Sequence, residues 1–166
     1  MSTEKKYILD KAAAASKLER MALEVLEQNM NASELILAGI RNSGSIVAKN
    51  VQALLAKHSS IPTRIITITL DKKHPAEVKL SEDIQYKDQV IIVIDDVANS
   101  GKTMLYAIQP FLAFHPKKIQ TFVLVERTHK AFPISSDFVG LSVATTLQEH
   151  IYVEVNDEEV LGAYLA

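Results

Sequence analysis

Cysteine is absent from the 166 residues of the chain. Its absence excludes disulfide bonds, thiolate catalysis and zinc sites built from cysteine ligands. Long apolar runs are missing too, because no stretch approaches the roughly 20 residues that a membrane-spanning helix needs. Residues 1–6 are polar and charged and lead into no apolar core of a secretory signal. We therefore expect a cytoplasmic protein with no membrane partner.

The chain also has little excess charge of either sign. Its 18 basic and 20 acidic residues give a net charge of −2. This balance provides no general attraction to nucleic acid, although a local basic patch could exist within it. Hydrophobic residues make up 48% of the chain and charged residues 23%, which is ordinary for a globular protein. The length suits a single domain over residues 1–166 with a substantial core.

Residues 89–104 contain the most informative pattern. A β-branched run at residues 90–94 is typical of a strand buried on both faces of a parallel sheet. The adjacent carboxylates of Asp95 and Asp96 end this run, and a short polar loop leads into an apolar-periodic helix from Lys102. Loop amides and a helix N-terminus can hold a phosphate, because several N–H groups there lack partners. The acid pair can hold ribose hydroxyls, or Mg²⁺ through water.

Two other interpretations of this stretch were weighed. Gly101, Lys102 and Thr103 look like the end of a Walker P-loop, but that motif needs a glycine five residues before Gly101. Asp96 stands there instead and would direct negative charge at the phosphates. The plainer interpretation is a buried strand that ends in two solvated acids and forms no site.

The rest of the chain predicts strands alternating with helices. We expect helices at residues 11–28, with Asp10 as N-cap, at residues 45–57, and from Lys102 onward, where Pro110 should kink the helix or end it at Gln109. Strands are expected at residues 35–40, 64–70, 118–125 and 137–140, with an edge strand at residues 151–155. The polar residues 71–88 predict a functional loop or a small hairpin.

This alternation predicts an α/β fold, an open and mostly parallel twisted sheet flanked by helices on both faces. Ligands bind such sheets beyond the carboxyl ends of the strands. Four loops with functional features lie at this edge: residues 39–44, 71–88, 95–103 and 126–130. The apolar residues 160–165 should pack on their own domain, although they could instead contribute to an interface.

Residues 93–103 resemble the phosphoribosyl-pyrophosphate (PRPP) motif of type I phosphoribosyltransferases. Residues 37–44 resemble the pyrophosphate loop of that family. Residues 123–130, with 133–134 and 137–140, are similar to the bifunctional pyrimidine-operon attenuator/uracil phosphoribosyltransferase group. The resemblance extends over most of the chain, from about residue 8 to residue 155.

The resemblance implies a Rossmann-like fold with a small C-terminal hood, and Mg²⁺-dependent transfer of phosphoribosyl from PRPP to a nitrogenous base, with release of pyrophosphate. A pyrimidine such as uracil is the favoured base, and a homodimer the favoured assembly. The implied catalytic residues are Asp95, Asp96, Lys72 and Lys73, with Asp95 and Asp96 also at the metal. The implied 5′-phosphate loop is Ala98, Asn99, Ser100, Gly101, Lys102 and Thr103. Arg41, Asn42, Ser43 and Gly44 would hold pyrophosphate, and Arg127, Phe138 and Val139 the base.

Three features depart from the attenuator group's pattern. Ser43 stands where that group has an arginine, and the segment 71–88 is shorter than the pattern leads us to expect. Asn99 stands where that group has an aromatic residue and purine-using relatives have an aspartate. Because an amide does not ionise, Asn99 cannot serve as the proton-accepting group.

Two alternatives to the enzyme are kept open. The resemblance of the C-terminal residues also suggests an RNA-binding regulator of pyrimidine operons. The slight excess of acidic residues disfavours this function. The departures at Ser43 and Asn99 suggest instead a non-catalytic module that binds PRPP or a nucleotide.

Overall fold

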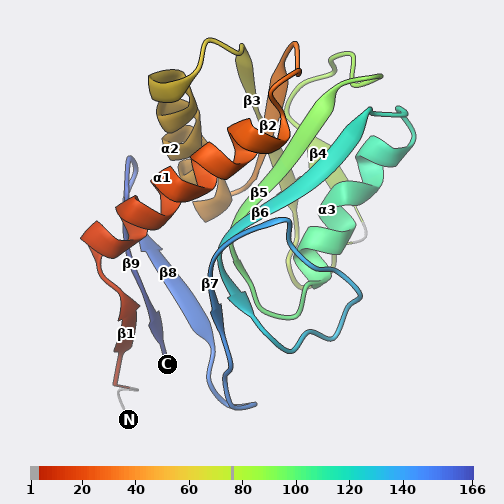
Figure 1. Ribbon diagram of the computed structural model, residues 1–166. Coiled ribbons are helices and arrows are strands. Elements are labelled where there is room, and N and C mark those ends of the chain that lie inside the picture. Colours follow the sequence, from red (N-terminus) through yellow and green to blue (C-terminus); the bar gives the residue numbers. More distant parts are fainter. Residues whose placement is uncertain (1–3, 76) are drawn as a thin grey trace.

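A six-stranded sheet forms the centre of the computed structural model, which describes residues 4–75 and 77–166 (Figure 1). Its strand order is β4-β3-β2-β5-β6-β7. All neighbouring strands are parallel except β4, which is antiparallel to β3. The predicted mostly parallel sheet is therefore confirmed. The bounds are β2 (Leu35–Ile40), β3 (Thr63–Leu70), β4 (Val78–Leu80), β5 (Val90–Ala98), β6 (Lys118–Arg127) and β7 (Phe138–Val143).

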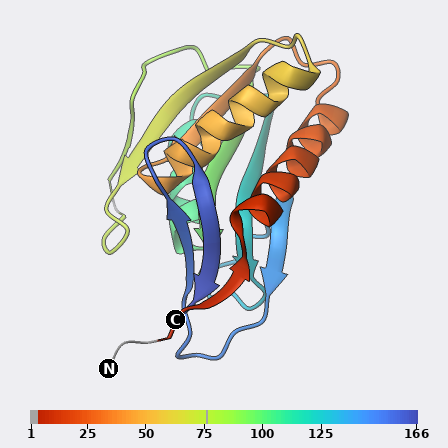
Figure 2. The ribbon, with the colours of Figure 1, turned by 90° about the vertical axis from the view of Figure 1, so that its left-hand side faces the viewer.

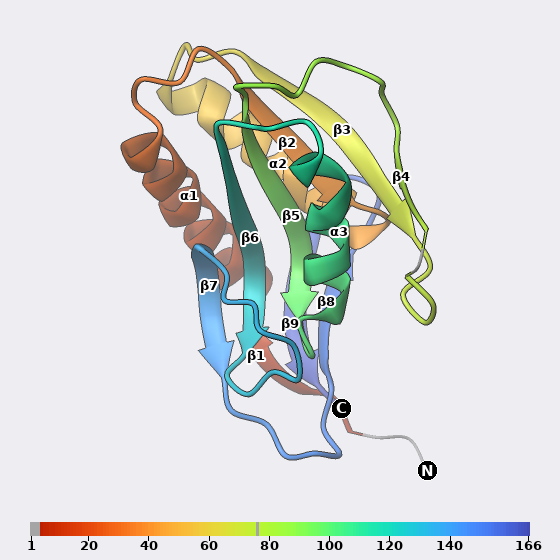
Figure 3. The same cartoon turned by 90° about the vertical axis from the view of Figure 1, so that its right-hand side faces the viewer.

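Helices cover both faces of this sheet. α1 (Lys11–Gln28) and α2 (Ser43–His58) lie on one face, and α3 (Lys102–Leu112) lies on the other (Figures 1 and 3). The β5 side chains alternate between the two layers, because successive residues of a strand point to opposite faces. Ile92 and Ile94 join the core under α1 and α2, whereas Ile91 and Val93 join the core under α3. This two-sided burial explains the unbroken β-branched run.

A second sheet, the hood, lies beside the first (Figure 2). It is antiparallel, with order β1-β9-β8, and consists of β1 (Lys6–Leu9), β8 (Ile151–Val155) and β9 (Val160–Leu165). The hood is thus not purely C-terminal, because β1 supplies one strand. The predicted edge position of β8 is confirmed. The apolar tail packs on its own domain as the middle strand of the hood, with Ala163 fully buried.

Several element boundaries differ from those expected. The central strand does not end at the acid pair: β5 continues to Ala98, because Val97 and Ala98 pair with Val125 and Glu126 of β6. α2 begins at Ser43, two residues before the expected start. Residues 71–88 contain β4, so the small-hairpin alternative is confirmed. α1 has the expected bounds, and the Ala13 N–H donates to the Asp10 carboxylate at 2.7 Å, as predicted for an N-cap.

Of the two effects expected of Pro110, a kink or an end at Gln109, the end at Gln109 is wrong. The helix continues through Pro110 to Leu112. Proline has no N–H to donate to the carbonyl four residues earlier, here that of Tyr106. Only two residues follow Pro110 in the helix, so a single missing hydrogen bond near the terminus does not stop it. None of the helices formed by the described residues combines the length and apolar character that crossing a membrane requires.

Replacing Pro110 with alanine should stabilise the protein. Pro110→Ala restores an N–H donor for the Tyr106 carbonyl, and we expect the free energy of unfolding to rise by about 1 kcal/mol. Thermal denaturation followed by circular dichroism should then shift upward by roughly 2–4 °C. The matched control is Pro116→Ala, which lies outside the helix and gains no helical hydrogen bond. A Pro110→Ala protein that melts at or below wild type would contradict this explanation.

Candidate functional site

Asp95 and Asp96 lie at the carboxyl end of β5 and are almost fully buried, with 2% and 6% of their surface exposed. The Asp96 N–H donates to Asp95 Oδ1 at 2.9 Å. On the other side, Lys72 Nζ lies 3.8 Å from Asp95 Oδ2. The segment that follows β3 therefore brings a cation close to the acid pair.

Gly44 brings the turn after β2 against the acid pair. A Cβ at this glycine would lie 2.7 Å from the Ile94 carbonyl oxygen and 3.1 Å from the Asp95 Cα. Any larger residue would therefore push the start of α2 away from β5. Glycine at position 44 therefore allows the first turn of α2 to lie against β5.

Burial raises the pKa of the Asp95 carboxyl well above its ordinary value, because the charged form is removed from water. The neighbouring Asp96 charge raises it further, and Lys72 lowers it. A carboxylate in such surroundings gains free energy from any cation or hydroxyl donor that reaches it.

A cavity of about 120 Å³ opens beside Asp95. Its lining includes Lys72, Asp95 and most of the loop expected to hold a phosphate, namely Ala98, Asn99, Ser100, Gly101 and Thr103. Gly101, with φ 83°, is the N-cap of α3, so the unpaired amides of the first helical turn lie next to the cavity. Lys102 belongs to this turn but does not line the cavity; its N–H donates to Ser100 Oγ at 3.2 Å.

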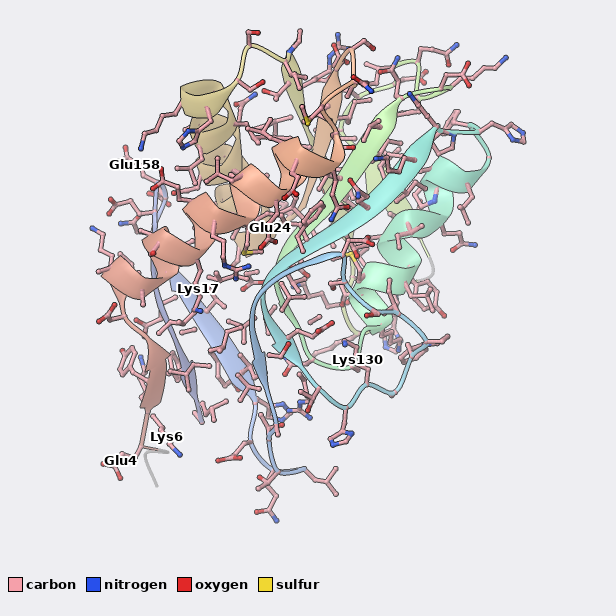
Figure 4. The ribbon with its side chains drawn as sticks, viewed as in Figure 1. Glu4, Lys6, Lys17, Glu24, Lys130 and Glu158 are labelled. Atoms are coloured by element: carbon pink, nitrogen blue, oxygen red, sulfur yellow. The ribbon has the colours of Figure 1, made fainter. Side chains whose placement is uncertain are left out.

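The turn between β6 and β7 holds this loop in place. The N–H groups of Ala131 and Phe132 both donate to the Ser100 carbonyl at 3.1 Å. Lys130 forms a nearly buried ion pair with Glu126, and Figure 4 shows it beside the start of α3. The Lys130 stem lies 3.3 Å from the position that a Cβ on Gly101 would occupy. This support was not predicted from sequence, where the four-residue spacing of Glu126 and Lys130 is the only signal for it.

Arg41 and Asn42 do not line the cavity beside Asp95. They border a separate, polar cavity of about 630 Å³, together with Thr67 and Thr69 of β3 and the turn of the hood. Arg41 Nε donates to Asn42 Oδ1 at 3.0 Å, and the peptide bond between these two residues is cis. Ser43 is the first residue of α2. Among the predicted pyrophosphate residues, Gly44 lies against the acid pair, since a Cβ on it would be 3.1 Å from Asp95 Oδ1.

The two predicted lysines are placed differently. Lys72 borders the cavity beside Asp95. Lys73 is exposed, its backbone N–H donates to the Asp71 carboxylate at 2.9 Å, and its side chain does not line that cavity.

The three residues predicted to meet the base are also separated. Phe138 is fully buried in the core under α1 and α2, where its ring centroid lies 6.2 Å from that of Phe122. Val139 faces the core under α3. Arg127 Nη2 donates to the Glu149 carbonyl, and its Nε is buried without a partner among the described residues. None of the three lines the cavity beside Asp95.

Asn99 contacts the hood instead of facing only the cavity. Its Nδ2 donates to the Ile151 carbonyl at 3.4 Å, and the Ile151 N–H donates to Asn99 Oδ1 at 3.5 Å. Neither contact could be inferred from local sequence, because 52 residues separate the partners.

The acid pair fits a magnesium ion that is completed by substrate oxygens. Asp96 Oδ1 is buried without a hydrogen-bond partner among the described residues, so an acceptor is available. The described residues contain no group of three or more ligand side chains that could enclose a metal. Mg²⁺ characteristically uses one or two carboxylates plus phosphate oxygens and water, which matches this limited set of ligands.

The fold and the site define a doubly wound α/β protein in which a loop at a helix N-terminus lies beside a buried acid pair. The model of the phosphoribosyl transferase domain matches residues 5–158. The chain belongs to this family. It is 34% identical to the "Bifunctional protein PyrR" of Staphylococcus carnosus, over 96% of this chain and 97% of that protein. Identity to the protein of the same name from Clostridium kluyveri is 31%, over 92% of both.

Solved structures agree with this fold. The hypoxanthine phosphoribosyltransferase of Trypanosoma cruzi superposes with a TM-score of 0.79 at 13% identity, covering 96% of this chain and 95% of that one. A hypoxanthine-guanine phosphoribosyltransferase of Bacillus anthracis gives 0.69 at 20% identity, covering 85% and 84%. At these identities the likeness extends to the fold and not to the substrate.

Removing the Asp95 charge should stabilise the free protein at neutral pH. The folded-state pKa of Asp95 lies above its unfolded value, so its contribution to stability is complete below that unfolded value, about 3.9, and is lost as the pH rises through the folded pKa. Asp95→Asn avoids this loss. We expect it to melt at least ~2 °C above wild type at pH 7, with a difference that shrinks toward pH 4.

The control for this prediction is Asp83→Asn, which neutralises an exposed carboxylate. It should leave the melting temperature nearly unchanged across the same pH series. If Asp95→Asn melts below wild type at pH 7, the ionised carboxylate contributes more through Lys72 than it loses through burial.

Proposed function

We propose that this protein transfers the 5-phosphoribosyl group of PRPP to a nitrogenous base, a pyrimidine such as uracil, with release of pyrophosphate. The buried acid pair beside a helix-N-terminal loop is the observation that carries the proposal. Family membership supports the reaction class. The relatives named PyrR support a pyrimidine over a purine.

In this proposal residues 98–103 hold the 5′-phosphate, and Asp95 and Asp96 hold the ribose hydroxyls. The loop amides and the hydroxyls of Ser100 and Thr103 supply donors to an anion at the start of α3. Asp95 and most of this loop border one cavity, which matches a sugar that carries its phosphate on C5′ and its hydroxyls on C2′ and C3′.

Chemistry takes place at C1′ of the ribose. The bond from C1′ to the pyrophosphate oxygen breaks, its electron pair leaves with pyrophosphate, and a base nitrogen forms the new bond and loses its proton. Positive charge develops on the ring, so positioning and charge stabilisation dominate. Lys72 is the cation nearest the acid pair, and with Lys73 we assign it to the departing negative charge. Arg41, Asn42, Ser43 and Gly44 are assigned to pyrophosphate.

Mg²⁺ is the proposed cofactor, with Asp95 and Asp96 contacting it through water or the ribose. When bound, it neutralises charge on the pyrophosphate. The base pocket is assigned to Arg127 at the carboxyl end of β6, with Phe138 and Val139 at the start of the neighbouring strand β7. A cytoplasmic location and a homodimer also stay predictions.

Turnover with a panel of bases tests the proposal. We expect pyrophosphate release from PRPP and Mg²⁺ with uracil, and little with hypoxanthine or guanine. Lys72→Ala should lower kcat/KM about 10²-fold, because one charge-stabilising contact in the transition state is lost. Lys79→Ala, on exposed β4, is the matched control and should retain wild-type activity. No turnover with any base would overturn the enzymatic role, and PRPP binding without turnover would establish the non-catalytic module.

Regulation through RNA is the second candidate, since the curated relatives carry the name "Bifunctional protein". The net charge of −2 argues against a broad basic face. We expect a pyrimidine-operon leader RNA not to bind at 50 mM salt, measured by fluorescence anisotropy against a scrambled RNA of the same length. Specific binding that weakens steeply with added salt would overturn this expectation and favour the regulator.

A further inference from the structure

The hood presents an edge that needs hydrogen-bond partners. His150 and Ala166 exchange two backbone hydrogen bonds, at 2.8 and 3.1 Å. Ile151 lies opposite Leu165, one residue further along this antiparallel pair. Hydrogen-bonded and non-hydrogen-bonded pairs alternate in such a ladder, so the N–H and C=O of Ile151 point away from β9. Because β8 is an outer strand and Ile151 is buried, these two groups require partners from outside the hood.

Asn99 supplies both partners with one side chain. Its amide donates to the Ile151 carbonyl and accepts from the Ile151 N–H, as a neighbouring strand would. A carboxylate in the same place could accept but not donate, and a phenylalanine ring could do neither. The residue type at position 99 therefore matches the hood edge. Asn99 also borders the cavity beside Asp95, so the same loop contacts both the hood and the site.

Arg127 makes a second contact with the same segment of the hood. Its guanidinium donates to the carbonyl of Glu149, two residues before Ile151. Arg127 ends β6, and Asn99 directly follows β5, which is the neighbouring strand. Two adjacent strand ends thus hold residues 149–151.

We propose that Asn99 is a positioning residue that joins the hood to the phosphate loop, so that a ligand on the loop stabilises the start of β8. This inference rests on the proposed 5′-phosphate site. Such coupling is reciprocal. Loss of the hood contact must lower the affinity for the ligand by the same factor by which bound ligand stabilises that contact. Asn99 therefore links two parts of the site without taking part in the bond changes.

Hydrogen exchange at the Ile151 amide measures the contact between Asn99 and Ile151 directly. We expect the exchange rate in the free protein to rise several-fold in Asn99→Ala, because the Ile151 N–H loses its hydrogen bond to Asn99, a long one at 3.5 Å. Adding PRPP and Mg²⁺ should slow exchange at Ile151 in wild type but not in Asn99→Ala. A general loss of stability would accelerate exchange without removing the response to ligand.

Asn50→Ala is the matched control. Asn50 of α2 also donates to the hood backbone, at the Glu158 carbonyl at 2.9 Å, but it does not border the cavity beside Asp95. This variant removes a hood contact of the same chemical kind. We expect it to keep the ligand-dependent protection of Ile151.

Asn99→Asp provides a rescue by pH. At pH 7 the carboxylate opposes the Ile151 carbonyl, and exchange should exceed the wild-type rate about tenfold. Below about pH 4 the protonated acid again has a donor and an acceptor, and the ratio to wild type at the same pH should approach one. Asn31→Asp, on an exposed turn, should match wild type at both pH values.

Calorimetric titration of wild type with PRPP separates this inference from the proposed function. If PRPP does not bind wild type, the phosphate site is wrong, and the coupling that rests on it is overturned as well. If PRPP binds but Asn99→Ala retains both slow exchange and the ligand response at Ile151, the coupling alone is overturned. If PRPP protects Ile151 in wild type and Asn50→Ala but not in Asn99→Ala, both are supported.

Discussion

The burial of the Asp95 carboxylate is the constraint on which the site depends. A charge placed almost out of contact with water is unfavourable unless cations or hydrogen-bond donors compensate for it. The free protein supplies the Asp96 N–H and, at 3.8 Å, the Lys72 ammonium, and these leave the pKa of Asp95 raised. The remaining demand can be met by ribose hydroxyls and a hydrated cation. A site arranged in this way is less stable when empty than when its ligand is bound.

The elements that form the site were largely predictable from sequence. The β-branched run of β5 has a strong local signal because it is buried by helices on both sides, and βα alternation implies a parallel sheet with its loops at one edge. Asp95 and Gly44 could therefore be placed together before their contact was known. Boundaries were less certain because they depend on partners: β5 extends past the acids only because β6 continues beside it.

Contacts between irregular segments could not be predicted in the same way. Lys130, Phe132 and Ser100 meet because two loops fold over each other, and neither loop has a periodic pattern that reports the other. The strand at residues 160–165 reads as an apolar tail because its partners are residues 6–9, at the other end of the chain, and β8. Local sequence describes the faces of elements well, whereas it does not describe which distant backbone groups remain to be satisfied.

Asn99 shows how these two kinds of information differ. Considered as chemistry, position 99 is informative for what it lacks, since an amide cannot ionise and so cannot take a proton from a substrate. Considered as structure, the amide has the donor and the acceptor that the buried edge of Ile151 requires. The two considerations concern one side chain at the border of one cavity. A residue type that satisfies the hood edge therefore also leaves position 99 uncharged at the border of the cavity.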